Sequence, residues 1–130
     1  MRAARALVAL GLALAAADAG ADEGLALGAV CRAEPGSGRQ VCRVKLTAPS
    51  GERLGWADVL VRSAPEDMRP LRSRVTAAVS SDGSRAEAVF GLVAREGAAG
   101  SVVIQGRAVA CRGERCRPVS SELEIAVAPP

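Results

Sequence analysis

Hydrophobic and polar residues alternate with a period of two through most of the chain beyond its first two dozen residues. Cys42, Val44 and Leu46 are separated by charged residues, and segment 119–128 alternates in the same way. Such alternation is typical of strands with one buried face and one face in water. No segment in this part of the chain has the 3.6-residue periodicity of an amphipathic helix, so the pattern predicts an all-β protein.

Turn-forming residues separate the alternating runs. They form the sequences EPGSG at 34–38, APSGE at 48–52, SAPED at 63–67, SSDGS at 80–84 and REGAAG at 95–100. Between them the pattern predicts strands near residues 25–33, 40–47, 54–62, 73–79, 85–94, 101–111 and 119–128. About seven short strands predict one immunoglobulin-like antiparallel β-sandwich over residues 22–130. We expect a thin aliphatic core with Trp56 and Phe90 as its only large side chains.

The N-terminus has the features of a secretory signal peptide. A basic head with Arg2 and Arg5 precedes an apolar run over 6–17, and small residues then offer cleavage after Ala19 or Ala21. The run is too short for a transmembrane helix, which needs roughly 17–25 residues. We therefore expect residues 1–21 to be removed and the remaining protein to be periplasmic or secreted, without a membrane span.

The composition excludes several classes of chemistry. The chain has no histidine, so it has no Ser–His or Cys–His catalytic pair and no imidazole metal ligand. It carries a net charge of only +3, with no tyrosine, one tryptophan and one phenylalanine. A nucleic-acid site would need a stronger basic patch with stacking aromatics. We therefore predict no nucleic-acid partner and no cofactor.

The four cysteines, Cys31, Cys42, Cys111 and Cys116, all follow the predicted signal peptide. An even number in an exported chain predicts two disulfides, with three connectivities open. We favour Cys31–Cys42, joined across a hairpin turn, and Cys111–Cys116, joined across a four-residue loop, each stabilising by roughly 2–3 kcal/mol. A Cys₄ zinc site is disfavoured because its cysteine pairs have two to four intervening residues, whereas ten separate Cys31 from Cys42.

The sequence CRGERCRP at 111–118 is the candidate site. Arg112, Arg115 and Arg117 flank the two cysteines, and cationic neighbours favour the thiolate form that attacks disulfides. We expect these arginines to tune a redox-active pair. A bridge that only pins two strands, with solvated arginines, is the alternative, and the residues alone slightly favour it.

The segment from Gly100 to Val127 resembles the end of the N-terminal periplasmic domain of the DsbD family of thiol:disulfide interchange proteins. The matching positions are Gly100, Val102, Ile104, Ala110, Cys111, Cys116 and Pro118, followed by a final alternating strand. That domain is an immunoglobulin-like sandwich whose two cysteines pass electrons from a membrane domain to periplasmic thioredoxin-like proteins. The resemblance implies that Cys111 and Cys116 are a redox pair with a thioredoxin-like protein or a membrane electron carrier as partner.

A second class of function remains open. The family covers its dithiol with an aromatic cap loop, whereas the chain has no tyrosine and segment 64–70 contains no aromatic residue. The Cys31/Cys42 pair is additional to the family's dithiol. A non-catalytic binding or accessory domain, stabilised by two disulfides, is therefore the competing hypothesis.

Overall fold

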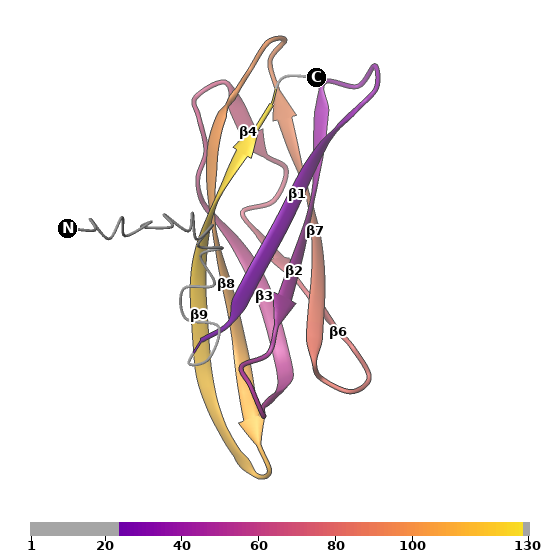
Figure 1. Cartoon of the computed structure of the whole chain (residues 1–130). Helices are drawn as coiled ribbons and strands as arrows, with labels where there is room; N and C mark the ends of the chain where they lie inside the picture. Colours follow the sequence, from indigo (N-terminus) through magenta and orange to yellow (C-terminus); the bar gives the residue numbers. More distant parts are fainter. Residues whose placement is uncertain (1–23, 129–130) are drawn as a thin grey trace, which may run out of the picture.

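Two antiparallel β-sheets pack face to face in the structure, a computed structural model that describes residues 24–128 (Figure 1). The predicted signal peptide at 1–21 lies outside the described residues. The strands of the described part are β1 (Ala26–Glu34), β2 (Arg39–Thr47), β3 (Arg53–Ser63), β4 (Met68–Pro70), β5 (Arg74–Thr76), β6 (Ala78–Val79), β7 (Arg85–Ala94), β8 (Gly100–Arg112) and β9 (Arg115–Val127). The all-β sandwich predicted from the alternation is confirmed. Within residues 24–128 no helix is long and apolar enough to span a membrane.

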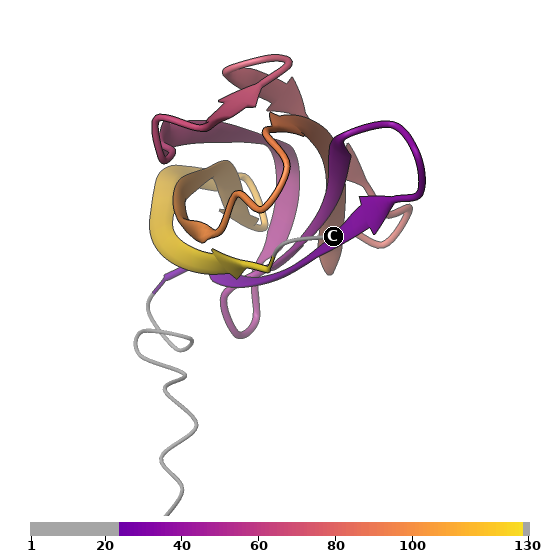
Figure 2. The ribbon, with the colours of Figure 1, turned by 90° about the horizontal axis from the view of Figure 1, so that it is seen from above.

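The strand order is that of an immunoglobulin-like fold. One sheet runs β1-β2-β7-β4, with β6 also pairing with β7, and the other runs β5-β3-β8-β9. The long strands therefore divide as β1, β2 and β7 against β3, β8 and β9, like strands A, B and E against C, F and G. Seen from above, the two sheets curve around a shared core (Figure 2).

The core between the sheets is aliphatic. Its fully buried large side chains include Val44, Leu46, Val59, Leu92, Val102 and Ile104, and Phe90 is 3% exposed. These residues come from the inward-facing positions of both sheets, as the period-two pattern requires. The expectation that Phe90 fills the core is therefore confirmed.

The expectation that Trp56 fills the core is wrong. Trp56 is 38% exposed and lies on the outer face of the second sheet. The register of β3 against β8 shifts between Leu54 and Trp56, with Gly55 as the extra residue of a β-bulge. Because one inserted residue moves every later side chain to the opposite face, Ala57 and Val59 point inward and Trp56 points out.

Three features of the strand arrangement also differ from the prediction: one expected strand is divided, one strand was not expected, and one begins earlier. The expected strand at 73–79 is divided between the sheets, since β5 pairs with β3 and β6 pairs with β7. Strand β4 forms in a segment with no alternating pattern, where Met68 is buried against the core. Strand β9 begins at Arg115 rather than at residue 119, and Pro118 is tolerated because β9 is an edge strand.

Candidate functional site

Two disulfides link hairpin partners, Cys31–Cys42 in β1–β2 and Cys111–Cys116 in β8–β9. The predicted pairing is confirmed. In both bridges the cysteines lie directly opposite each other in the strand register, with Cα atoms 4.0 Å apart. Two disulfides in so small a domain indicate an oxidising, extracellular-type environment.

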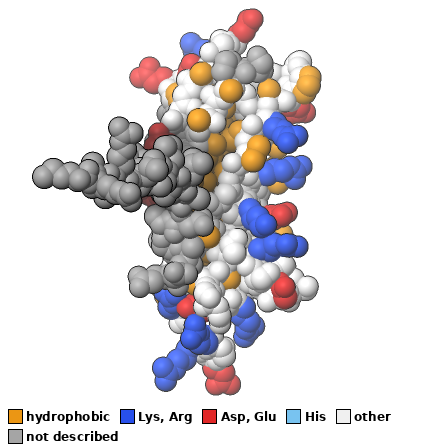
Figure 3. Space-filling view, in the orientation of Figure 1, with side chains coloured by type: hydrophobic (Ala, Val, Ile, Leu, Met, Phe, Trp, Pro, Cys, Tyr) orange, Lys and Arg blue, Asp and Glu red, His pale blue; other side chains and the backbone are white. Residues whose placement is uncertain are grey.

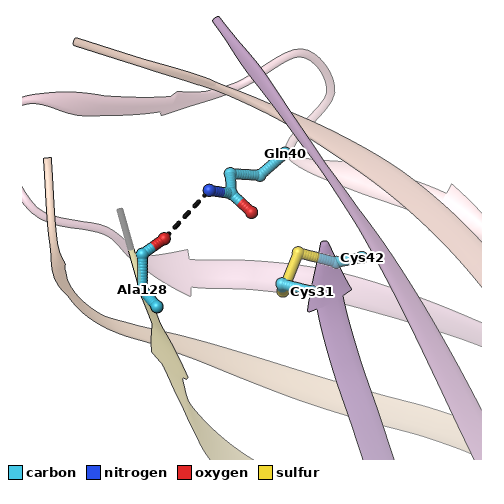
Figure 4. The surroundings of a disulfide bond; sticks show 4 residues. All are labelled: Cys31, Gln40, Cys42 and Ala128. Carbon is cyan, nitrogen blue, oxygen red and sulfur yellow. Dashed lines mark hydrogen bonds between the residues drawn. A yellow bond between two sulfur atoms is a disulfide. The ribbon is translucent and has the colours of Figure 1, made fainter. Parts of the chain in front are cut away.

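The Cys31–Cys42 bridge lies against the core. Cys42 is completely buried and lies opposite Phe90 in β7. Gln40, also buried, donates from Nε2 to the Ala128 carbonyl oxygen at 3.0 Å, which ties β2 to the residue after β9 (Figure 4). This bridge is thus surrounded by packed structure on its core side.

The Cys111–Cys116 bridge lies near the tip of the β8–β9 hairpin, at the lower end of the molecule in Figure 1. The turn is only two residues long, Gly113 and Glu114, and Gly113 has a φ of 58°. Glycine at the first position with positive φ, followed by a residue with negative φ, is typical of a type II′ hairpin turn. Cys111 is 7% exposed, whereas Cys116 belongs to the exposed residues.

The Cys111 sulfur lies next to Gly55, a residue without a side chain to cover it. A Cβ atom placed on Gly55 would come within 3.8 Å of the Cys111 Sγ. The bulge residue therefore leaves no side chain beside the sulfur. The sequence does not single out Gly55, because its position next to Cys111 depends on the β3–β8 register.

Strand alternation directs the three flanking arginines to the face of the hairpin opposite the bridge. Arg112 donates to the Ser50 carbonyl oxygen at 3.2 Å, and Arg117 forms an ion pair with Glu52 at 2.9 Å. Arg115 is exposed and has no ion pair within residues 24–128. Their predicted tuning role therefore depends on charge acting across the hairpin, and it stays a prediction.

A small cavity of about 160 Å³ lies on this arginine side of the hairpin. Its lining residues are Glu52, Ala110, Arg112, Arg115, Cys116 and Arg117. The Glu52 side chain is 12% exposed, and its Oε2 atom has no hydrogen-bond partner in the described part of the chain. Glu52 lies 65 residues from Arg117 in sequence, so no local motif could have connected them.

A larger groove of about 430 Å³ lies on the outer face of the second sheet. Its lining residues are Trp56, Gln105, Arg107, Ala108, Val109, Pro118, Val119 and Ser120. The Val109–Pro118 pair is two positions along from Cys111–Cys116 in the same register, and hence on the same face. The groove therefore extends from beside the exposed bridge toward the middle of the sheet.

A buried carboxylate holds one wall of this groove. Asp58 is 0% exposed, although it lies on the outer face. Arg107 Nε donates to its Oδ1 at 2.9 Å and Arg74 Nε donates to its Oδ2 at 2.7 Å. Both guanidinium carbons lie 5.9 Å from the centroid of the Trp56 ring, so the cluster fixes that ring by cation–π contacts.

The electrostatics of the cluster follow from these contacts. Burial raises the pKa of Asp58, but hydrogen bonds and charge from Arg107, and then from Arg74, outweigh burial and hold the pKa below its ordinary value. The hydrogen bond to Asp58 raises the pKa of Arg107 in turn. Both partners of Asp58 come from other strands, Arg74 from β5 and Arg107 from β8.

The geometry defines a class of protein: an immunoglobulin-like β-sandwich with one core-facing disulfide and one disulfide at an exposed hairpin tip. Within residues 24–128 no group of three or more His, Cys, Asp or Glu side chains has the arrangement of a metal site. Protein-family models and curated proteins both gave no match to the chain.

Proposed function

We propose that the protein exchanges thiols and disulfides with a partner protein, through Cys111 and Cys116, in a periplasmic type of compartment. The observation that carries this proposal is the position of the bridge, at a two-residue hairpin turn with Cys116 exposed. A disulfide reacts only if an incoming thiolate reaches one of its sulfurs. Cys42 of the other bridge is completely buried.

The exposure of the two cysteines assigns the order of events. A partner thiolate attacks Sγ of Cys116, the disulfide breaks, and Cys111 leaves as a thiolate with the electron pair of the broken bond. The partner is then joined to Cys116 in a mixed disulfide. A second thiolate of the partner attacks its own sulfur in that bond and releases Cys116. The partner dithiol is oxidised, the hairpin pair has gained two electrons, and its thiolates take protons from water. The reverse sequence passes the electrons onward.

The arginines stabilise the thiolates that form. Arg112 and Arg115 each adjoin one of the cysteines in sequence, and Arg117 follows Cys116. Positive charge nearby lowers the cost of a leaving thiolate. We expect Arg115 to contribute most to stabilising the thiolates, because the charge of Arg117 is partly neutralised by Glu52.

The resemblance of segment 100–127 to the DsbD family supplies the class of partner: a thioredoxin-like protein or a membrane electron carrier. The sandwich fold and the cysteine hairpin support this choice, since both are what the resemblance implies. The groove beside the bridge, with Trp56 and Pro118 in its lining, offers apolar surface against which a partner segment can pack.

A redox titration tests the proposal. The protein is equilibrated with graded dithiothreitol or glutathione buffers, free thiols are alkylated, and each cysteine pair is quantified by mass spectrometry. We expect Cys111–Cys116 to be reduced first, with a potential above about −300 mV, while Cys31–Cys42 stays oxidised and the circular dichroism spectrum is unchanged. A hairpin potential far below that value, or unfolding when this bridge opens, would rule out exchange.

Trapping variants test the order of attack. Cys111→Ala leaves Cys116 as a single exposed thiol, and Cys116→Ala leaves the shielded Cys111 as its matched control. We expect the Cys116 thiol to form a mixed disulfide with an oxidised thioredoxin-like protein at least about tenfold faster. Equal rates would contradict the assignment of Cys116 as the attacked sulfur.

A binding or accessory domain is the second candidate, and the outer groove is the observation that favours it. The Asp58 cluster holds Trp56 half-exposed at the groove, and the Val109–Pro118 pair stands beside the bridge. If the protein is a binding domain, the hairpin disulfide has only a structural role, which is to fix the end of the groove. A bridge that resists reduction in the titration leaves this as the supported function.

A further inference from the structure

The outer face of the first sheet carries a concentration of positive charge that the disulfide site does not use. It presents six exposed basic residues, Arg32 of β1, Arg39, Arg43 and Lys45 of β2, Arg69 of β4 and Arg85 of β7, with Glu34 and Glu87 as its acidic residues. We call this set, with the valines between its members, the basic face. Figure 3 shows Lys and Arg side chains in a column along the right-hand side, beside β2 and β7 of Figure 1.

The strand register shows how these charges are arranged. Arg43 lies directly between Val30 of β1 and Val89 of β7. Arg32 lies opposite Val41, and is therefore diagonal to both Arg39 and Arg43. Diagonal neighbours on one sheet face are about 7–8 Å apart, so like charges are held close together along β2.

The charge of the domain is unevenly distributed. Residues 24–128 contain fifteen basic and eleven acidic residues. Six basic and two acidic residues belong to the basic face, which leaves nine and nine for the rest of the described chain. The net charge of the described residues therefore lies on this one sheet face.

These six cations are not neutralised by ion pairs in the described part of the chain. None of them forms an ion pair within residues 24–128, where the ion pairs join Arg74 and Arg107 to Asp58 and Arg117 to Glu52. Even Glu34, opposite Arg39, is not within ion-pair distance of it. The charges are left available to an external anion.

Exposed apolar side chains lie among the cations. Of the large hydrophobic residues exposed in the described part, Val30, Val89 and Val93 are on this face at 58%, 48% and 42% exposure. Leu71, 53% exposed, covers Gly91 of β7, where an added Cβ would come within 2.8 Å of its Cδ1. Trp56, on the other sheet, is the remaining member of that set.

We propose that the basic face docks on a bilayer surface that contains anionic phospholipid. Guanidinium and ammonium groups bind the headgroup phosphates, and the valines and Leu71 contact the boundary between headgroups and acyl chains, as apolar residues of interfacial elements do. The β8–β9 hairpin belongs to the other sheet, so docking leaves the exposed disulfide free. This inference does not depend on thiol–disulfide exchange.

The make-up of the face favours a lipid surface over a protein or a nucleic acid. Protein interfaces have an apolar centre rich in aromatic residues and depleted in lysine, with charges at the rim. Here Arg43 and Lys45 are central, and the valines are scattered between charges. Nucleic acids bound without groove contacts need stacking aromatics, and the chain's Trp56 and Phe90 lie elsewhere. A face that mixes cationic and apolar side chains in this way matches a fluid array of phosphates.

Vesicle sedimentation tests the proposal. The exported protein is mixed with phosphatidylcholine vesicles with or without phosphatidylglycerol, and the bound fraction is measured at low and high salt. We expect binding only to the vesicles with phosphatidylglycerol, and its loss at high salt. Binding to neither kind of vesicle, or equally to both, would overturn the proposal.

Two double variants locate the surface. Arg39→Gln with Arg43→Gln removes two charges from the basic face, and we expect about 25-fold weaker binding, roughly fivefold for each cation lost. Arg53→Gln with Arg62→Gln removes the same charge from exposed positions of β3 in the other sheet, and we expect less than about threefold weakening. All of these proteins have the same N-terminus, so its effect on binding cancels in the comparison. Equal losses in the two variants would overturn the proposal, as would tighter binding to soluble polyglutamate than to the vesicles, which would indicate an acidic protein partner.

Discussion

The two disulfide-bridged hairpins are alike in local geometry and differ in their surroundings. Both join directly opposed cysteines of adjacent antiparallel strands, with Cα atoms 4.0 Å apart. In β1–β2 the bridge faces the core and Cys42 is 0% exposed. In β8–β9 it faces outward near a two-residue turn, and Cys116 is exposed.

This difference shows that bridge geometry does not decide whether a disulfide can react. Position along the strand decides it, because alternate residues of a strand point to opposite faces of the sheet. In the core-facing bridge Cys42 is completely buried and Cys31 is half-buried, whereas Cys116 of the hairpin bridge is exposed, so the hairpin bridge is the more accessible of the two in the native fold. Four sets of variants test this comparison, in order of decreasing effect.

Removing each bridge in turn has the largest effect. The double variant Cys31→Ala with Cys42→Ala removes a bridge between residues 11 positions apart. It should lower the free energy of unfolding by about 3 kcal/mol. Cys111→Ala with Cys116→Ala should cost about 2 kcal/mol, because its separation is only 5 residues. Urea denaturation measures both. A greater loss from the hairpin bridge would contradict the view that Cys31–Cys42 is the main structural bridge.

Asp58→Asn should lower the free energy of unfolding by about 2 kcal/mol, because two guanidinium groups lose a buried carboxylate partner. The folded pKa of Asp58 lies below its ordinary value. Its stabilisation is therefore complete above the ordinary aspartate pKa of about 3.9, and it is lost as the pH falls through the lower folded pKa. Urea denaturation at several pH values should show this acid-dependent loss in the wild type and a smaller one in the variant.

The control for Asp58→Asn is Glu96→Gln, an exposed turn position that should leave stability unchanged. Asp58→Asn should also speed reduction of Cys111–Cys116 more than that of Cys31–Cys42, since the cluster braces the outer face beside the hairpin. Equal acceleration of both bridges would show a general loosening of the sandwich instead.

Gly113→Ala tests the turn that presents the exposed bridge. Gly113 has a φ of 58°, and an added Cβ would meet no atom within 4 Å. The expected loss of about 1 kcal/mol is therefore a backbone effect alone. Gly28→Ala in β1 is the matched control, because its Cβ also meets nothing and its φ is not positive. Thermal denaturation should separate the two; similar melting temperatures would refute the turn assignment.

Gly55→Ala should have the smallest effect. The added methyl group would lie 3.8 Å from the Cys111 Sγ, in ordinary contact, and should change the rate of reduction of the hairpin bridge by less than about twofold, because the incoming thiolate attacks the Cys116 sulfur. Timed alkylation after dithiothreitol addition measures the rate. A marked slowing of the hairpin bridge, with the Cys31–Cys42 bridge unaffected, would show that Cys111 is the attacked sulfur instead.

Much of the fold could be predicted from local patterns. The alternation located the strands that became β1, β2, β3, β7 and β8 nearly to their ends. The turn at 34–38 and the short loop after Cys111 were enough to predict both disulfide pairs. Strand β4 and the division of 73–79 between the sheets were missed, because very short strands depend on the neighbours that they pair with.

The surroundings of the candidate site could not be predicted in the same way. The bulge at Gly55 turned Trp56 outward, and alternation turned Arg112, Arg115 and Arg117 away from the bridge that they flank in sequence. Asp58 found its partners 16 and 49 residues away. Such contacts depend on register between strands that are distant in the chain.

The sequence by itself determined the strand content, the turns, the two disulfide pairs and the shortage of aromatic and imidazole chemistry. These properties depend on side-chain type and short-range spacing. Only the tertiary structure decided which bridge faces the core, which carboxylate is buried between arginines, and that the net positive charge of the described residues lies on one sheet face. A strand's faces acquire an inside and an outside only when a second sheet packs against one of them.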